Sequence, residues 1–217
     1  LNMNNYISLK NIIKIYLKKQ KIKALNNINI NFNLGKIYSI VGPSGSGKST
    51  LLNLISLIDK PSSGSLAINN SEIDFTNQSK NDLFRSSSIG IIYQNYNLLN
   101  DFTTLENVSL AELALTDNVS QSKINGRKVL KNLGLASRMN HYPSELSGGE
   151  NQRTAIARAI INKPKILLAD EPTGNLDHKT AKSVFKTLFN LRKNNRLIIF
   201  ATHNREFADL SDCKIEM

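Results

Sequence analysis

A glycine-rich segment near residue 45 constrains the fold of this chain more than any other feature. The spacing of its residues (glycine, four residues, then Gly-Lys-Ser) is typical of a phosphate-binding loop. The segment consists of Gly42, Pro43, Ser44, Gly45, Ser46, Gly47, Lys48, Ser49 and Thr50. The apolar run before it, residues 36–41, predicts a buried parallel strand, and leucine and isoleucine recur at helical spacing after it until Asp59 and Pro61. This flanking pattern favours a phosphate-binding loop over an ordinary surface turn.

A strand, a glycine-rich turn and the start of a helix together create an anion-binding site. The amide groups of the first helical turn have no partner within the helix, and the helix dipole favours negative charge there. Glycines allow the backbone to wrap around a phosphate without clashes of Cβ atoms. We therefore expect Lys48 to reach the β- and γ-phosphates of a nucleotide, and the Ser49 hydroxyl to bind the Mg²⁺ ion that bridges them.

A second glycine-rich turn precedes another predicted helix. It comprises Leu146, Ser147, Gly148, Gly149 and Glu150. This turn is again suited to an anion, because it lies at a helix N-terminus. One nucleotide does not need both of these sites.

Polar side chains also follow three of the predicted buried strands. Asp170 and Glu171 follow one, Gln94 the second and His203 the third. The carboxyl edge of a parallel sheet faces the ligand crevice. There Asp170 suits direct or indirect Mg²⁺ binding, Glu171 suits accepting a proton from water, and the Gln94 carbonyl suits binding Mg²⁺ and positioning that water. An acidic pair after a strand can equally be a helix cap or surface charge, and a lone histidine is usually structural.

The remaining pattern predicts a β layer before the loop and helices in the middle of the chain. Residues 6–32 alternate apolar and polar, which indicates half-buried antiparallel strands, and residues 66–70 predict a strand that joins them. Tyr16 could stack on an adenine ring or could simply be packed. Residues 95–145 change to helical spacing, with helices expected over 104–115 and 121–133.

Composition limits the number of domains and the class of partner. The 217 residues, of which 40% are hydrophobic, suffice for one substantial core. No apolar run approaches the roughly 20 residues needed to cross a bilayer, so we expect a soluble or membrane-peripheral protein. The single cysteine excludes an internal disulfide framework. The net charge of +11 makes an acidic partner plausible: a nucleic acid, a nucleotide or an anionic membrane surface.

In this order and spacing, the motifs resemble those of the ATP-binding subunits of ABC transporters. The resemblance spans residues 1–217 as one ABC ATPase domain, with a RecA-like core (1–94 and 146–217) and a helical subdomain (95–145). It implies an α/β P-loop NTPase fold with a mixed or parallel core sheet and an N-terminal antiparallel β layer. The matching motifs are Walker A (42–50), the Q-loop (Gln94), the signature (146–150), Walker B (166–170), the catalytic glutamate (Glu171), the D-loop (Asp177) and the switch histidine (His203).

The resemblance also implies how such a chain would work. Two copies would form a head-to-tail homodimer in which Walker A of one and the signature of the other enclose ATP and Mg²⁺. Glu171 would activate water and His203 would stabilise the γ-phosphate. The homodimer would bind integral membrane permease subunits peripherally, at the cytoplasmic face of a bacterial inner membrane, and no nucleic acid is expected. The residues implied to contact ATP are Tyr16, Gly42 to Thr50, Gln94, Ser147, Gly148, Gly149, Asp170 and Asp177, and Ser49, Gln94 and Asp170 would bind the metal.

Within the family, residues 93–108, 143–150 and 169–177 look most like the ATPases of lipoprotein-releasing systems. One alternative is a MacB- or FtsE-like ATPase with another cargo or a role in cell division. A nucleic-acid-associated ABC protein, suggested by the charge, would usually carry two cassettes or a long coiled coil, and the sequence shows neither. Two positions depart from the family pattern: Asn151 where arginine is usual and Asn204 where aspartate is usual. The second departure leaves open how the histidine loop is held.

Overall fold

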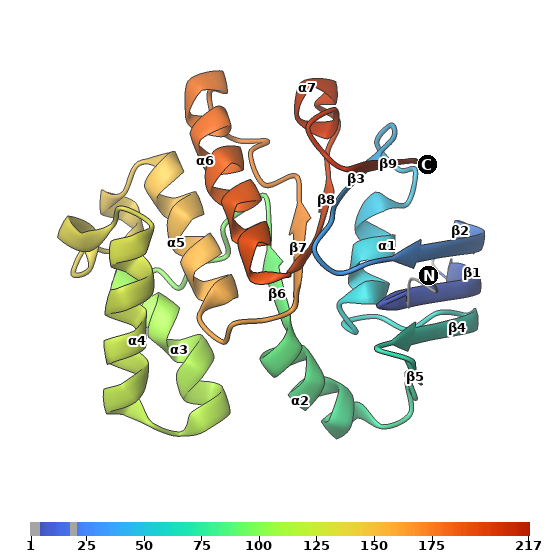
Figure 1. Ribbon diagram of the computed structural model, residues 1–217, viewed down its shortest axis with the longest axis horizontal. Coiled ribbons are helices and arrows are strands. Elements are labelled where there is room, and N and C mark those ends of the chain that lie inside the picture. Colours follow the sequence, from blue (N-terminus) through green and yellow to red (C-terminus); the bar gives the residue numbers. More distant parts are fainter. Residues whose placement is uncertain (1–4, 18–20) are drawn as a thin grey trace.

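The computed structural model, which describes residues 5–17 and 21–217, contains two β-sheets (Figure 1). The first sheet is antiparallel, with the strand order β2-β1-β4-β5. The second is parallel throughout, with the order β6-β7-β8-β3-β9. The antiparallel strands are β1 (Ile7–Leu17), β2 (Lys21–Phe32), β4 (Ser63–Ile68) and β5 (Ser71–Glu72), and the parallel strands are β3 (Ile37–Val41), β6 (Ile89–Ile92), β7 (Ile166–Asp170), β8 (Leu197–Ala201) and β9 (Cys213–Glu216).

The parallel sheet buries both of its faces, because helices cover each of them. Successive side chains of a strand point to opposite faces. Leu168 and Ile199 therefore face helix α1 (Lys48–Ile55) and the antiparallel sheet, whereas Leu167 and Ile198 face the other side. That other side is covered by α5 (Gly148–Ile160), α6 (His178–Asn190) and α7 (Arg205–Ala208). Helix α1 thus lies between the two sheets, and α5 lies across the parallel sheet from it (Figure 1).

Between β6 and β7 the chain becomes mostly helical from residue 104 onward. It contains α3 (Thr104–Thr116), α4 (Val119–Asn132), the short turns η1 (Ala136–Arg138) and η2 (Pro143–Glu145), and then α5. These elements share a third cluster of buried side chains that includes Val108, Leu130 and Leu135. Thr103 caps α3 and forms a reciprocal capping box with Glu106, which explains why the helix begins where it does.

Most predicted elements are confirmed, but several short or polar ones are found only in the structure and one helix ends early. Helix α2 (Gln78–Ser88) was not predicted because it is almost entirely polar and lacks an apolar stripe. The short elements α7 and β9 were also not predicted, and β9 is recognisable only by its pairing with β3. Helix α1 ends at Ile55 rather than near Asp59, since Leu57 adopts a left-handed backbone (φ 60°) that stops the helix. The turn η3 (Leu191–Asn194) follows α6.

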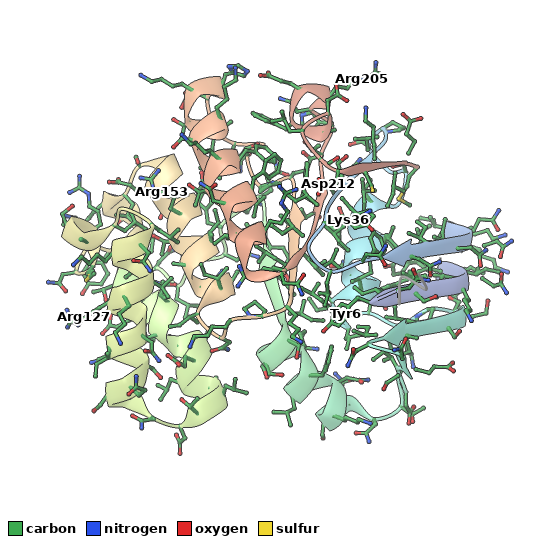
Figure 2. All side chains as sticks on the ribbon, in the orientation of Figure 1. Tyr6, Lys36, Arg127, Arg153, Arg205 and Asp212 are labelled. Carbon is green, nitrogen blue, oxygen red and sulfur yellow. The ribbon has the colours of Figure 1, made fainter. Side chains whose placement is uncertain are left out.

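Basic side chains are distributed over several elements. Figure 2 labels Arg127 on α4, Arg153 on α5 and Arg205 on α7, in different parts of the molecule. Across the described residues, no helix combines the length and apolarity required to span a bilayer.

Candidate nucleotide-binding site

The predicted phosphate-binding loop connects β3 to α1, as expected. Gly47 caps α1 with a left-handed backbone (φ 101°) and provides no side-chain hydrogen bond, so the amides of the first turn remain available to an anion. A Cβ atom at Gly47 would lie 2.5 Å from the carbonyl oxygen of Ala24, which excludes any larger residue. The loop is therefore shaped by its glycines for close approach of a ligand.

Lys48 folds back over this loop. Its side chain is buried, and Nζ donates hydrogen bonds to the carbonyl oxygens of Gly42 (2.8 Å) and Pro43 (3.0 Å). The hydroxyl of Ser46 is buried and has no hydrogen-bond partner among the described residues. An ammonium group whose described hydrogen bonds go to backbone carbonyls can exchange them for phosphate oxygens, and the unpaired Ser46 hydroxyl of the same loop can donate to one.

Strand β7 brings Asp170 to the carboxyl edge of the parallel sheet. Asp170 Oδ1 is buried and makes no hydrogen bond within the described part of the chain. A buried carboxylate oxygen without a partner is costly unless a ligand satisfies it. Asp170 therefore fits the Mg²⁺ ligand set predicted with Ser49 and Gln94.

Glu171 and His203 come together, although 32 residues separate them. Glu171 Oε2 lies 3.0 Å from His203 Nδ1 and accepts a hydrogen bond from the His203 amide (3.4 Å). The Glu171 amide donates to Ala201 O (3.0 Å), and its φ of 45° is unusual for a residue with a side chain. The Glu171 side chain is 17% exposed, whereas that of His203 is 72% exposed. The carboxylate is thus fixed in a sheltered position and the imidazole is accessible.

Gln94 is held by a residue that the sequence analysis missed. Its Nε2 donates to Asn175 Oδ1 (3.1 Å), and Asn175 Nδ2 donates to the oxygens of Gln94 (3.3 Å) and of Asn95 (3.0 Å). A Cβ at Gly174 would lie 2.7 Å from Gln94 Nε2, so glycine permits this close approach. The only signal for Asn175 in the sequence was its position in the turn before Asp177.

The second glycine-rich turn starts α5 with a reciprocal cap. Ser147 Oγ accepts from the Glu150 amide (3.3 Å), and Glu150 Oε2 accepts from the Ser147 amide (2.8 Å). Arg138 Nε donates to Glu150 Oε1 (2.8 Å). The hydrogen bond from Arg138, with those of Ser147, lowers the pKa of Glu150 to about 2.

Asn151, which stands where arginine is usual in the family, has hydrogen-bond partners of its own. Its Nδ2 donates to the carbonyls of Pro143 (3.0 Å) and Leu146 (3.3 Å), which explains how asparagine fits at this position.

We expect Glu150→Gln to destabilise the protein by about 0.5–1.5 kcal/mol, because a neutral amide can still cap α5 but loses the charge-assisted hydrogen bonds that Arg138 and the Ser147 amide make to the carboxylate. Because the pKa of Glu150 is lowered on folding, its contribution is complete above its unfolded pKa and disappears as the pH falls towards 2. Thermal unfolding of the variant and of the wild type should therefore differ at pH 7 and converge in acid. Glu72→Gln, on exposed β5, is the control and should leave the unfolding temperature unchanged at pH 7; a difference that persists undiminished at low pH would contradict the argument.

The signature residues lie beside the D-loop of the same chain. A Cβ built at Gly148 would be 2.9 Å from Leu176, and one at Gly149 would be 2.6 Å from Thr180. Asp177 caps α6 by accepting a hydrogen bond from the Thr180 amide (3.0 Å). The phosphate loop starts α1 and the signature starts α5, and these two helices cover opposite faces of the parallel sheet.

Two further residues that the sequence analysis missed support these motifs. Arg158 of α5 donates to the carbonyls of Asn97 (2.6 Å) and Tyr96 (2.8 Å), just beyond Gln94. Burial lowers the pKa of Arg158. Asp59 accepts a hydrogen bond from the Tyr16 hydroxyl (2.7 Å). A basic residue in the apolar part of α5 was a signal for Arg158, whereas nothing in the sequence connected Tyr16 with Asp59.

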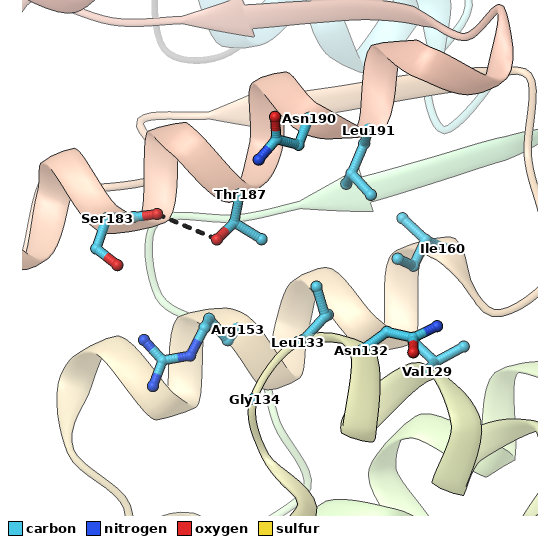
Figure 3. A pocket seen from close by; sticks show the side chains of 10 residues that line it. All are labelled: Val129, Asn132, Leu133, Gly134, Arg153, Ile160, Ser183, Thr187, Asn190 and Leu191. Atoms are coloured by element: carbon cyan, nitrogen blue, oxygen red, sulfur yellow. Dashed lines mark hydrogen bonds between the residues drawn. The ribbon is translucent and has the colours of Figure 1, made fainter.

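One cavity lies at the predicted site, and another lies away from it. One of 210 Å³ is lined by residues that include Glu171, Gly174, His178 and His203. Figure 3 shows a larger groove between α4, α5 and α6, with Arg153 and Leu133 on one side and Thr187 on the other. None of the predicted nucleotide-binding residues lines that groove.

Comparisons with known proteins agree with this arrangement. The family model described as "ABC transporter" matches residues 25–174. Lipoprotein-releasing system ATP-binding protein LolD of Rickettsia bellii (strain RML369-C) is 44% identical, with 96% of this chain and 93% of the relative covered. LolD of Wigglesworthia glossinidia brevipalpis is also 44% identical, with 99% and 96% covered.

Solved structures show the same fold. The dimeric structure of a post-hydrolysis state of the ATP-binding cassette MJ0796 bound to ADP and Pi has a TM-score of 0.89 and 36% identity, with 97% of this chain and 94% of that chain covered. The expected P-loop NTPase fold and the predicted ATPase are therefore confirmed, and the chain belongs to the ABC transporter family.

Proposed function

We propose that this ATPase powers the release of lipoproteins from a bacterial inner membrane toward the outer membrane. It would act as a homodimer, bound at the cytoplasmic face to integral membrane permease subunits of the LolC and LolE kind. The support is that relatives named for lipoprotein release match almost the whole chain, at 44% identity over 211 residues in one case and 46% over 213 in another.

The observation that carries the homodimer is the placement of the two glycine-rich turns. Each starts a helix with amides suited to phosphate, but α1 and α5 cover opposite faces of the parallel sheet. The closest neighbours of the signature glycines belong to the D-loop and α6, not to the phosphate loop of the same chain. A second copy in the opposite orientation would bring its Ser147, Gly148 and Gly149 to the nucleotide held by the first.

In each site the phosphate loop would bind the triphosphate, with Tyr16 stacked on the adenine ring. Lys48 would exchange its contacts with the Gly42 and Pro43 carbonyls for phosphate oxygens. Ser49, Gln94 and Asp170 would hold Mg²⁺, and the unpaired Asp170 Oδ1 supports this set. The ion would neutralise charge on the phosphates during the reaction.

Glu171 would act as the general base. Its carboxylate would accept a proton from water as the water oxygen attacks the γ-phosphorus and ADP leaves. His203 Nδ1 contacts Glu171, which leaves Nε2 for the γ-phosphate. Closure of the homodimer on ATP and its reopening after hydrolysis would then drive the permease.

The helical subdomain, residues 95–145, would provide the contact with the permease. A cavity of 570 Å³ lies beside the segment that follows Gln94, lined by Tyr96, Leu98 and Pro143 among others. Leu99 and Phe102 are large apolar side chains exposed in the same segment. A permease segment that enters the cavity would be close to the Gln94–Asn175 contact.

A mixing experiment tests the homodimer. Lys48→Ala would disable the phosphate loop and Gly148→Asp the signature, because its carboxylate would repel the γ-phosphate of the partner. Each variant alone should be inactive, and a mixture should regain phosphate release, because one site of each mixed dimer contains two intact motifs. Gly148→Ala, which adds the same Cβ without charge, is the matched control and should be far more active than Gly148→Asp. No recovery on mixing, with both variants folded, would contradict a shared site.

The cargo is tested with the membrane complex. The ATPase and its permease, reconstituted in proteoliposomes, should release a triacylated protein when ATP is added. The lipid-anchored protein should also stimulate ATP hydrolysis, whereas the same protein without its lipid anchor should not. Equal responses to both forms would contradict lipoprotein release and favour another cargo.

A further inference from the structure

Tyr16 is anchored by a charged pair that the nucleotide-binding motifs do not include. Lys14 and Tyr16 are two residues apart on β1, and both side chains reach Asp59. Lys14 Nζ donates to Asp59 Oδ1 (2.5 Å) and to the Lys60 carbonyl (2.7 Å). The Tyr16 hydroxyl donates to the other carboxylate oxygen, Asp59 Oδ2 (2.7 Å). One carboxylate thus binds both side chains.

These contacts are sheltered from solvent. The Lys14 side chain is 10% exposed and that of Asp59 is 25% exposed. Burial raises the pKa of the Asp59 carboxyl, but the hydrogen bonds from Lys14 and Tyr16 outweigh burial and lower it overall. An ion pair of this kind is costly to break, because the remaining charge is left without a partner.

The position of Asp59 connects the pair to the phosphate loop. Asp59 lies in the turn after α1, the helix that starts at Lys48. The Asp59 amide donates to the Asn53 carbonyl of α1 (3.2 Å), so the turn that carries Asp59 is held against the helix. The Tyr16 ring is therefore fixed relative to the helix whose N-terminus would hold the phosphates.

Lys14 also determines which face of the ring is available. Its Nζ lies over the Tyr16 ring, 4.8 Å from the centroid. A base can therefore stack only on the opposite face. A tyrosine fixed at its hydroxyl and covered on one face loses little freedom when a base binds.

We propose that Asp59 and Lys14 are positioning residues that hold the Tyr16 ring, at a set distance from the phosphate loop, to receive the adenine of ATP. The inference rests on the proposed binding of ATP by this loop. It assigns to Asp59 and Lys14 a contribution to base binding without contact with the base.

The test compares binding of ATP with binding of tripolyphosphate, both with Mg²⁺, by calorimetry. Tripolyphosphate occupies the phosphate loop but has no base. Tyr16→Ala should weaken ATP binding about 5- to 100-fold, the usual range for loss of base stacking. Tyr16→Phe, which keeps the ring but loses the bond to Asp59, and Asp59→Ala should each weaken ATP binding by a part of that factor. None of the three should change the affinity for tripolyphosphate.

A double variant separates positioning from general damage to the fold. In the Tyr16→Ala background, Asp59→Ala should have no further effect on ATP binding, because there is no ring left to position. The proposal is overturned if Asp59→Ala weakens ATP and tripolyphosphate equally, or if Tyr16→Phe binds ATP as the wild type does. A wild-type protein that binds neither ligand would instead contradict the proposed function itself.

Discussion

Glu171→Gln should lower the rate of ATP hydrolysis about 10²- to 10⁴-fold, the usual contribution of a general base, while ATP binding is retained. Glutamine has nearly the same shape and can still accept the hydrogen bond that the His203 amide donates to Oε2 of Glu171. It cannot take a proton from water. The left-handed backbone at residue 171 does not change, so the effect should be confined to the chemical step. Phosphate release at saturating ATP measures the rate, and calorimetry measures the affinity.

The same variant should accumulate as an ATP-bound dimer, because two copies can close on ATP but cannot hydrolyse it and reopen. Size-exclusion chromatography with and without ATP would show this. Glu72→Gln is the control, since Glu72 lies on β5 in the antiparallel sheet and should not affect turnover. Near-normal hydrolysis by Glu171→Gln would remove Glu171 from the role of base.

Lys48→Ala should abolish tight nucleotide binding. The buried ammonium is the only side-chain cation that contacts the loop carbonyls among the described hydrogen bonds, and hydrogen bonds to charged groups are worth about 1.5–3 kcal/mol each. Loss of one such bond lowers the affinity about 10- to 100-fold, and Lys48 could make more than one with phosphate. Calorimetry with ATP and Mg²⁺ measures the change.

Lys36→Ala is the matched control for charge, because Lys36 lies just before β3, at the opposite end of the strand from the loop. It removes the same charge and should leave ATP affinity nearly unchanged. Unaltered affinity in Lys48→Ala would contradict the assignment of the phosphate loop. A similar loss in both variants would indicate that net charge, rather than the position of Lys48, controls binding.

The fold could be predicted from the sequence because each motif is formed by residues that are close together in the chain, and the motifs follow one another in a recognisable order. The strand before Gly42, the acids after residues 166–169 and the capped turn at Ser147 are set by neighbouring residues, through strand periodicity and helix capping. The elements that were not predicted lack such a pattern. Helix α2 has no apolar stripe, and β9 depends on a distant strand for its hydrogen bonds.

The residues that hold the predicted site residues in place were harder to predict than the site residues themselves. Gln94 was identified, but the amide that holds it belongs to Asn175, 81 residues away. Tyr16 was identified with two possible roles, but its bond to Asp59 crosses 43 residues. Such contacts arise from how sheets and helices pack, and no spacing rule in a single sequence encodes them.

Helix α5 mechanically connects the signature with residues 96–97. It begins with the cap at Ser147, and near its far end Arg158 grips the backbone of Tyr96 and Asn97. A helix of 13 residues is a stiff rod about 20 Å long. We therefore expect a displacement of residues 96–97 to reach the glycines at the other end of α5 along this helix, and also through the Tyr96 hydroxyl, which lies 3.1 Å from where a Cβ of Gly148 would be.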